Sequence, residues 1–311
     1  MRILSFLNMK NRDVKGVEKG EDTRPTLKNF FKQFWRKLSH LLSLNILMLL
    51  QVLPIVIAVL AFFFTRMTPS QTSAIFAPLY GASLIEPSAT SSLLISLEAL
   101  PLNIPVFQPA AYWIIAACAL FLILTIGWQS VGTFYVLRGL VRGDAVFVFG
   151  DYFYAIKRNF KQGFLFGLVD SLIIIISTFD LLYYSQAVGA FWMDVVFWMM
   201  AAVSLLYMFM RPYIYMMLIT FDMKIRKMFK NALIFTALGI KRNLMAALGI
   251  VLLVAIHLAL IIVTPINVII PVILPIVYIF AAIGFMTAYA IYPVIDRYMI
   301  APYQNENTEQ A

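Results

Sequence analysis

Two residues of opposite charge lie inside long apolar runs of this chain. Asp170 stands nine residues after Lys161, and Arg211 stands eleven residues before Asp222. Because an ionised side chain in hydrocarbon needs a partner or a water-filled cavity, we expect Asp170 and Arg211 to pair or to share one polar cavity. The pair would serve either as a structural clamp between helices or as a proton or substrate site.

A second group of polar residues lies towards the opposite ends of the apolar runs. His257 is well inside one run, and Asp180 and Asp194 are placed where they could reach the same depth. A histidine in a helix bundle is typically a hydrogen-bonded packing residue; with the two carboxylates it would instead form a pH-sensitive cluster. We expect no metal site and no cofactor, because neither another histidine nor a thiolate accompanies His257. The single Cys118 also has no partner for a disulfide.

The usual sequence motifs of enzymes are missing. The chain contains no GxxxxGK[ST] loop for nucleotide phosphates and neither an HExxH nor a GxSxG motif. Two histidines and one cysteine leave no convincing nucleophile–base pair. The segment KNALIFTALGIKRN lacks the glutamate and the glycine spacing with which importer permeases contact their ATPase. We therefore predict no catalytic residues and no enzymatic activity, and we reject the permease itself.

Composition indicates a membrane protein. Hydrophobic residues make up 62% of the 311 residues, charged residues make up 13%, and the mean hydropathy is +0.87. A soluble core of this size cannot bury so much apolar surface, whereas a lipid bilayer can. We predict an all-α, polytopic membrane protein that has the lipid bilayer as its surroundings.

Charge-free runs mark the predicted spans, since a helix needs roughly 20 apolar residues to cross the hydrocarbon layer. The run from Asn243 to Ile295 is too long for one crossing, and TPIN at residues 264–267 divides it because proline removes a backbone donor. Six spans result, at residues 40–64, 110–136, 163–184, 191–219, 244–263 and 268–294. The predicted organisation is an N-terminal segment 1–37, a membrane domain 38–300 with an external loop 65–108, and a tail 301–311.

Basic residues collect at alternate ends of the predicted spans. Of the 24 lysines and arginines, ten lie in residues 1–40, five in 138–161 and seven in 211–242, whereas loop 65–108 holds only Arg66. Positive charge collects on the cytoplasmic side of membrane proteins, so six spans place both termini in the cytoplasm. The same distribution favours contact with anionic lipid headgroups and argues against a nucleic-acid partner.

The tetrapeptide IKRN occurs at residues 156–159 and 240–243, each time before a long apolar run, and a looser relative, KNFF, occurs at 28–31. One interpretation is three topological anchors, in which the cations lie among lipid phosphates and asparagine satisfies amides where a helix begins. The other is an internal repeat of three helix pairs in the same orientation.

Two segments on the predicted cytoplasmic side have the pattern of surface helices. In residues 151–164, Asp151 is suited to cap the start, and an apolar stripe is formed by Phe149, Phe153, Ile156 and Phe160. In residues 224–243, one side is formed by Ile225, Met228, Phe229 and Ala232. Such helices rest on the anionic lipid surface or dock a partner. The candidate docking residues are Asp151, Lys157, Arg158, Asn159, Lys161, Lys227, Lys230, Lys241, Arg242 and Asn243.

A GxxxG motif formed by Gly163 and Gly167 opens the third predicted span. Glycines at this spacing allow close approach of helices, either within the bundle or between two copies of the chain, and the sequence does not set the oligomeric state. In loop 65–108, leucines on one helical face predict a short helix on the outer leaflet. It is either an insert without catalytic consequence, a cap on an outward cavity or a contact for a solute-binding protein.

Three stretches resemble the YesL-like family of bacterial integral membrane proteins. They are GVEKGEDTRP followed by FWRKLSHLLSLNILMLL, TFYVLRGLVRGDAVFVFGDYFYAIKRNFKQG, and YMFMRPYIYMMLITFDMKIRKMFKNALIF. The resemblance covers roughly residues 12–62 and 110–250, and loop 65–108 departs from the family's usually short first connection. The family has no established reaction, and its members are often encoded beside carbohydrate importers. The resemblance therefore implies importer subunits as partners and the bacterial cell membrane as the location.

Two hypotheses of function follow, from different classes. The first is a non-enzymatic membrane protein that assists a carbohydrate uptake system and docks through its basic helices. The second is a self-contained transporter of a small solute, with Asp170 and Arg211 lining its path. A membrane enzyme without a known motif is the least supported alternative.

Overall fold

The structure is a computed structural model that describes residues 25–66, 109–186, 191–263 and 269–302. Every regular element in these ranges is a helix, so the predicted all-α class is confirmed. The chain forms two compact units, one of residues 52–122 and one of the remaining residues on either side of that range. The predicted helix of loop 65–108 and the break at TPIN lie outside the described residues.

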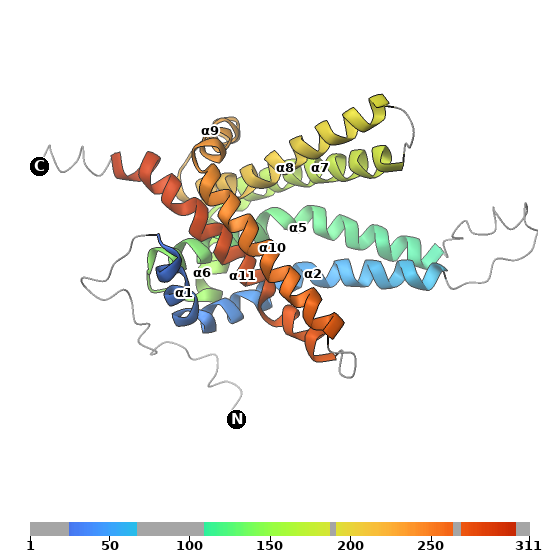
Figure 1. Cartoon of the computed structure of the whole chain (residues 1–311), viewed down its shortest axis with the longest axis horizontal. Helices are drawn as coiled ribbons and strands as arrows, with labels where there is room; N and C mark the ends of the chain where they lie inside the picture. The colour runs from blue at the N-terminus through green and yellow to red at the C-terminus, as the bar shows by residue number, and fades with distance from the viewer. Residues whose placement is uncertain (1–24, 67–108, 187–190, 264–268, 303–311) are drawn as a thin grey trace, which may run out of the picture. The chain divides into compact units, whose positions relative to one another are not determined.

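Figure 1 shows the described helices in chain order. They are α1 (Leu27–Arg36), α2 (Leu38–Arg66), α5 (Pro109–Arg142), α6 (Val148–Arg158), α7 (Phe160–Gln186), α8 (Phe191–Thr220), α9 (Ile225–Leu238), α10 (Ile240–Val263), α11 (Ile269–Ile295) and the π-helical turn η2 (Asp296–Ile300). Six of the described helices are long and apolar enough to cross a membrane. Their spans are Leu38–Phe63, Ala110–Arg142, Phe160–Gln186, Phe191–Thr220, Ile240–Leu260 and Ile276–Ile300, in agreement with the six predicted runs.

The order of elements repeats three times. A short helix, a single non-helical residue, a long helix and a long returning helix occur as α1–α2–α5, as α6–α7–α8 and as α9–α10–α11. The three break residues Lys37, Asn159 and Gly239 have nearly the same backbone conformation, with φ of −99°, −109° and −91° and ψ of 12°, 27° and 8°. These angles lie in the bridge region, where the third residue of a type I turn is also found. The order supports the internal repeat over a set of unrelated anchors.

The repeated IKRN sequence does not occupy equivalent places in this repeat. Asn159 is itself the break residue, whereas Asn243 lies four residues after the break at Gly239. Both asparagines also act differently from the prediction, because each donates to a carbonyl of the preceding short helix rather than satisfying an amide. Asn159 Nδ2 donates to Ala155 O at 3.0 Å, and Asn243 Nδ2 donates to Thr236 O at 3.2 Å. The carbonyl of Thr236 is one of the last that the end of α9 leaves open, whereas Ala155 O also accepts from Asn159 N at 3.0 Å.

The two short helices α6 and α9 face the bundle in different ways. In α9 the predicted apolar side is the packed side, since Met228 and Ala232 are fully buried. In α6 the packed residues are Val148, Tyr152 and Ala155, while Phe149 and Phe153 are about half exposed. The predicted phenylalanines of α6 therefore lie on its outer face, whereas Ile156 of the same stripe is partly buried against the core. Asp151 is not the N-cap, because the helix begins three residues earlier and the Asp151 carboxylate accepts from Phe147 N at 2.8 Å.

The end of α8 lies at the centre of the larger unit. Seven consecutive residues, Tyr213 to Ile219, are buried on every side of the helix. A helix that is apolar and buried all round is a core helix rather than a surface one. Both α7 and α9 pack against α8, as does α11. The elements on either side of α8 are therefore positioned by it.

The GxxxG motif is used inside the chain, where α7 crosses α5. A Cβ atom added to Gly127 of α5 would lie 2.7 Å from Gly167 Cα, too close for any side chain. Beside this contact, Trp128 Nε1 donates to Phe160 O at 2.9 Å and the two rings stack with centroids 4.5 Å apart. The glycines allow the two backbones to touch.

We expect Gly127→Ala to destabilise the protein by about 1–3 kcal/mol, the usual cost of overpacking, because the added methyl group forces α5 away from α7. Thermal unfolding in detergent would measure the effect. The matched control is Gly150→Ala in α6, where the nearest atom to a new Cβ is 3.8 Å away. Equal melting temperatures for the two variants would contradict the close contact of α5 and α7.

Lys37, the first break residue, is a buried cation. It is 2% exposed, and its Nζ has no hydrogen-bond partner among the described residues. Burial and the neighbouring Arg36 lower the pKa of Lys37 below 10.5, and the Asp144 carboxylate offsets only part of this. The folded chain therefore releases this proton at a lower pH than the unfolded chain does. Stability should rise with pH in the range below 10.5, because the unfolded state there holds more protons.

We expect Lys37→Met to stabilise the protein at pH 7 by about 1–3 kcal/mol, since it removes a buried donor without a partner. It should also flatten the rise of melting temperature between neutral pH and pH 10. Lys32→Met, at an exposed position of α1, is the control. A Lys37→Met variant that melts below the wild type at pH 7 would show that the ammonium is satisfied.

Candidate functional site

Asp170 is positioned by the face of α7 that packs against α5. The buried residues of α7 are Gly163, Phe166, Gly167, Asp170 and Ser171. They follow the spacing of a single helical stripe, so the close approach at the glycines carries Asp170 into the bundle one turn later. Asp170 is 0% exposed and stands about 15 Å along the helix axis from the start of α7.

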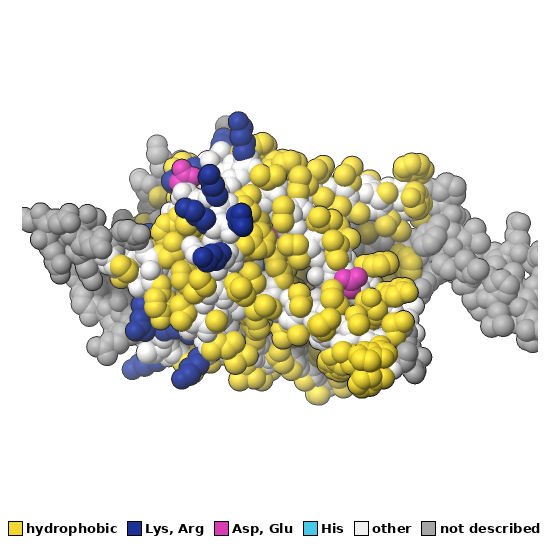
Figure 2. Space-filling model, turned by 90° about the horizontal axis from the view of Figure 1, so that it is seen from above, with side chains coloured by type: hydrophobic (Ala, Val, Ile, Leu, Met, Phe, Trp, Pro, Cys, Tyr) yellow, Lys and Arg dark blue, Asp and Glu magenta, His cyan; other side chains and the backbone are white. Residues whose placement is uncertain are grey.

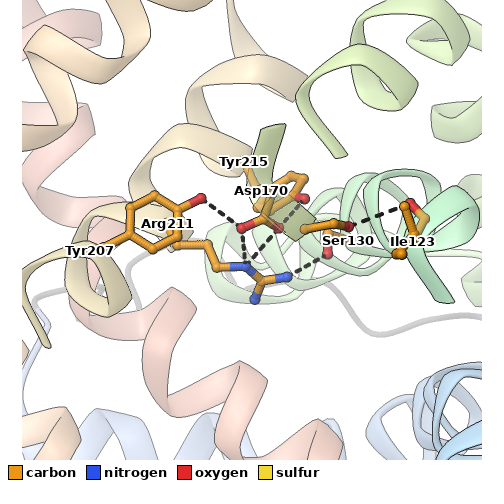
Figure 3. A network of polar contacts seen from close by, with 7 residues as sticks. Ile123, Ser130, Asp170, Tyr207, Arg211 and Tyr215 are labelled. Carbon is orange, nitrogen blue, oxygen red and sulfur yellow. Dashed lines mark hydrogen bonds and ion pairs between the residues drawn. The ribbon is translucent and has the colours of Figure 1, made fainter. Parts of the chain in front are cut away.

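Three side chains of α8 surround the Asp170 carboxylate (Figure 3). Arg211 Nε donates to both oxygens, at 2.9 Å to Oδ1 and 2.8 Å to Oδ2. The hydroxyl of Tyr207 donates to Oδ1 at 2.7 Å, and that of Tyr215 donates to Oδ2 at 2.6 Å. Because these donors are spaced four residues apart along α8, they share one helix face. The structure thus brings together the two charges that the sequence singled out.

The cluster also reaches α5. Arg211 Nη2 donates to Ser130 Oγ at 3.3 Å, and its guanidinium lies 5.2 Å from the centre of the Tyr215 ring. Tyr215 is held in turn between two aromatic rings, with Phe134 stacked on it at 5.8 Å and Phe166 edge-on at 4.8 Å. Three helices, α5, α7 and α8, therefore meet at one ion pair.

The geometry favours a clamp over a proton or substrate site. Each oxygen of Asp170 already accepts two hydrogen bonds, so a proton or a ligand would have to displace a charge-assisted bond. Three cavities of about 430–570 Å³ occur among the described residues, and neither Asp170 nor Arg211 lines any of these three. Arg211 keeps 24% of its side-chain surface accessible, whereas Asp170 keeps none.

The predicted outer cluster is not assembled. Nδ1 of His257 lies 2.7 Å from Leu253 O, and Nε2 lies 2.7 Å from the hydroxyl of Tyr278. Both ring nitrogens are thus occupied by neighbours other than Asp180 and Asp194. His257 is a hydrogen-bonded packing residue that joins α10 to α11. Within the described ranges no group of three histidine, cysteine or acidic side chains is arranged to hold a metal ion.

The candidate docking residues divide into exposed cations and structural groups. Lysine and arginine side chains gather over α9 at one end of the face seen in Figure 2, beside a hydrophobic surface. We call this end of the long helices, next to α6 and α9, the basic side. The exposed docking residues are Lys157, Arg158, Lys161, Lys227, Lys230 and Lys241, and Arg242 is half-buried. Asp151, Asn159 and Asn243 are instead engaged in the bonds that shape helix ends.

Sequence reasoning missed the two tyrosines and the serine that complete the cluster. Tyr207 and Tyr215 flank Arg211 at four residues on either side, a spacing that would have placed them on its helix face. Ser130 lies on α5, and no local pattern connects it with α8. The sequence signal for the tyrosines was present, whereas the one for Ser130 was not.

Comparison with known proteins gives one match. Residues 109–181 match the family DUF624, described as a protein of unknown function. The matched segment contains α5, α6 and most of α7, and thus Ser130, both glycines of the GxxxG motif and Asp170. It is consistent with the resemblance to the YesL-like family. No curated protein and no solved structure matches the chain.

We expect Asp170→Asn and Arg211→Gln each to cost about 3–5 kcal/mol of stability, because each leaves a buried partner charge uncompensated. The double variant should lose clearly less than the sum of the two, a deficit that melting curves of all four proteins in detergent would measure. Tyr207→Phe, which removes a single hydrogen-bond donor, should cost about 1 kcal/mol. Strictly additive losses would contradict direct coupling between the two charges.

Proposed function

We propose that this chain is a non-enzymatic, multi-pass membrane protein that assists a bacterial carbohydrate uptake system. In this proposal the basic side faces the cytoplasm, both termini lie there, and the exposed cations of α9 dock an importer subunit. The gathering of lysine and arginine at alternate span ends supports the orientation. The resemblance to the YesL-like family supports the class of partner.

The single observation that carries the docking proposal is the orientation of α9. Its apolar residues Met228 and Ala232 are fully buried against the protein, so they are not available to a lipid surface. Its cations Arg226, Lys227 and Lys230 point outward and are exposed. The first two turns of α9 therefore present charge, whereas Leu233, Ile234 and Leu238 further along the helix are about half exposed. The charged part suits an acidic protein surface together with anionic headgroups.

The buried ion pair supports a scaffold more than a carrier. Arg211 fixes α8 against α7, and α8 continues through its fully buried end to the connection with α9. A transporter must rearrange the helices around its site, and here that would break four hydrogen bonds to one carboxylate. The ion pair and the buried end of α8 thus hold α9 in a fixed position.

The alternative is a self-contained transporter of a small solute. The partial exposure of Arg211 favours it, because a guanidinium reached from outside the cluster could bind an anionic group. Flux of a sugar or an organic acid into liposomes that contain this protein alone would support the transporter and overturn the assisting role.

The docking proposal is tested by cross-linking in native membranes followed by purification of the complex. We expect a carbohydrate importer subunit in stoichiometric amount. Lys227→Glu with Lys230→Glu should reduce its recovery about tenfold or more, since like charges at a rim oppose association. The control is Lys28→Glu with Lys32→Glu, the same change on exposed residues of α1. Equal loss in both variants, or no importer subunit with the wild type, would contradict docking through α9.

A further inference from the structure

Two adjoining cavities open on the basic side, where helix ends from all three repeats meet. One, of about 540 Å³, is lined by Arg138 and Arg142 of α5, Arg158 of α6, and residues of α8, α11 and η2. The other, of about 570 Å³, is lined by Lys157, Arg158 and Lys161, and by the end of α8. The cavities share Arg158 and the segment Ile219–Phe221, so Arg158 belongs to both walls.

The protein holds Arg138 in place through one nitrogen of its guanidinium, and the other two nitrogens make no hydrogen bond to the described residues. Its Nη1 donates to Ile219 O at 3.2 Å and to Thr220 Oγ1 at 2.9 Å. The guanidinium also lies 4.9 Å from the centre of the Tyr135 ring. A guanidinium has five N–H donors, and the described residues engage only those of Nη1. Arg138 is therefore a preorganised donor with Nε and Nη2 remaining for a ligand.

The charges that line the two cavities are unbalanced. Five cationic side chains face two carboxylates, those of Asp222 and Asp296. Arg142 also pairs with Asp144 at 3.3 Å. Arg158, Lys157 and Lys161 form no ion pair or hydrogen bond with the described part of the chain through their side chains. Positive charge therefore exceeds negative charge around Arg158.

Neutralisation of helix ends explains part of this surplus. α5, α6 and α8 end near the cavities, and each C-terminus is equivalent to about half a negative charge. Arg138 meets this need for α8, since it binds the carbonyl of Ile219 directly. The start of α7, at Phe160, lines the second cavity and contributes the opposite, positive end of a helix dipole. A net positive site remains.

We propose that the two adjoining cavities bind the phosphate group of an anionic ligand at Arg158, which lies in both walls, with Arg138 from one cavity and Lys161 from the other. Arginine forks match the geometry of phosphate oxygens, and lysine adds a point charge. The volumes lie within the range of small-molecule sites. An anionic phospholipid headgroup and a soluble phosphorylated metabolite share this chemistry. The inference is independent of docking through α9.

The experiment uses the full chain in nanodiscs, with melting temperature and native mass spectrometry as readouts. In phosphatidylcholine discs at matched ionic strength, a rise in melting temperature with inorganic phosphate or pyrophosphate indicates a soluble ligand. In phosphate-free buffer, stabilisation and retention of phosphatidylglycerol, compared with phosphatidylcholine, indicates a headgroup. Either result supports the proposal only if the test variant below weakens it and the control variant does not.

The test variant is Arg158→Gln with Lys161→Gln, which leaves the structural bonds of Arg138 intact. We expect it to weaken phosphate or phosphatidylglycerol binding at least about tenfold, the usual effect of losing charge-assisted hydrogen bonds. Lys28→Gln with Lys32→Gln removes the same charge from α1 and should bind like the wild type. If neither probe stabilises the wild type, the arginines serve only to neutralise helix ends and the proposal is overturned. It is also overturned if the test variant responds to the probes as the wild type and the control do.

Discussion

The buried Asp170 carboxylate constrains this fold more than any other single group. An ionised carboxylate at this depth among apolar helices is unfavourable unless several donors reach it. Those donors come from one face of α8, so the depth of Asp170 in α7 fixes the depth of Arg211 in α8. Ser130 adds the third helix, α5, to the same point. A shift of any of these helices by one turn would break the set.

The close packing of α5 and α7 is what makes this arrangement possible. Backbone contact at Gly127 and Gly167 brings the two helices near enough for α8 to reach both of them. The aromatic residues around Tyr215 then fill the space between the three helices without adding unsatisfied polar groups. From there α8 runs, buried on all sides, to the start of α9. The glycine packing thus allows the ion pair to form, and the ion pair positions the end of α8 that leads to the basic side.

The sequence predicts the spans because long runs without a charged residue are rare. It predicts the ion pair because a charged residue inside such a run is rarer still. It predicts the faces of the short helices poorly. In water an apolar stripe points inward, but next to lipid both the packed and the outer face of a helix are apolar, so the phenylalanines of α6 do not reveal their side. Tyr207 and Tyr215 escape notice for a related reason, since tyrosine is common in such helices. The pairing of Arg138 with α8 joins residues 81 apart and has no local signal at all.

The threefold order of elements gives a physical reason for the concentration of arginine on the basic side. Each returning helix, α5, α8 and α11, brings its C-terminal end to this side, and the partial negative charges of three such ends need cations nearby. Arginine suits this role because its long side chain can bind a carbonyl on another helix, as Arg138 does at Ile219. Once several arginines converge for that purpose, the donors they do not use face a common hollow. The electrostatics that close the fold therefore also create a place where an anion is stabilised.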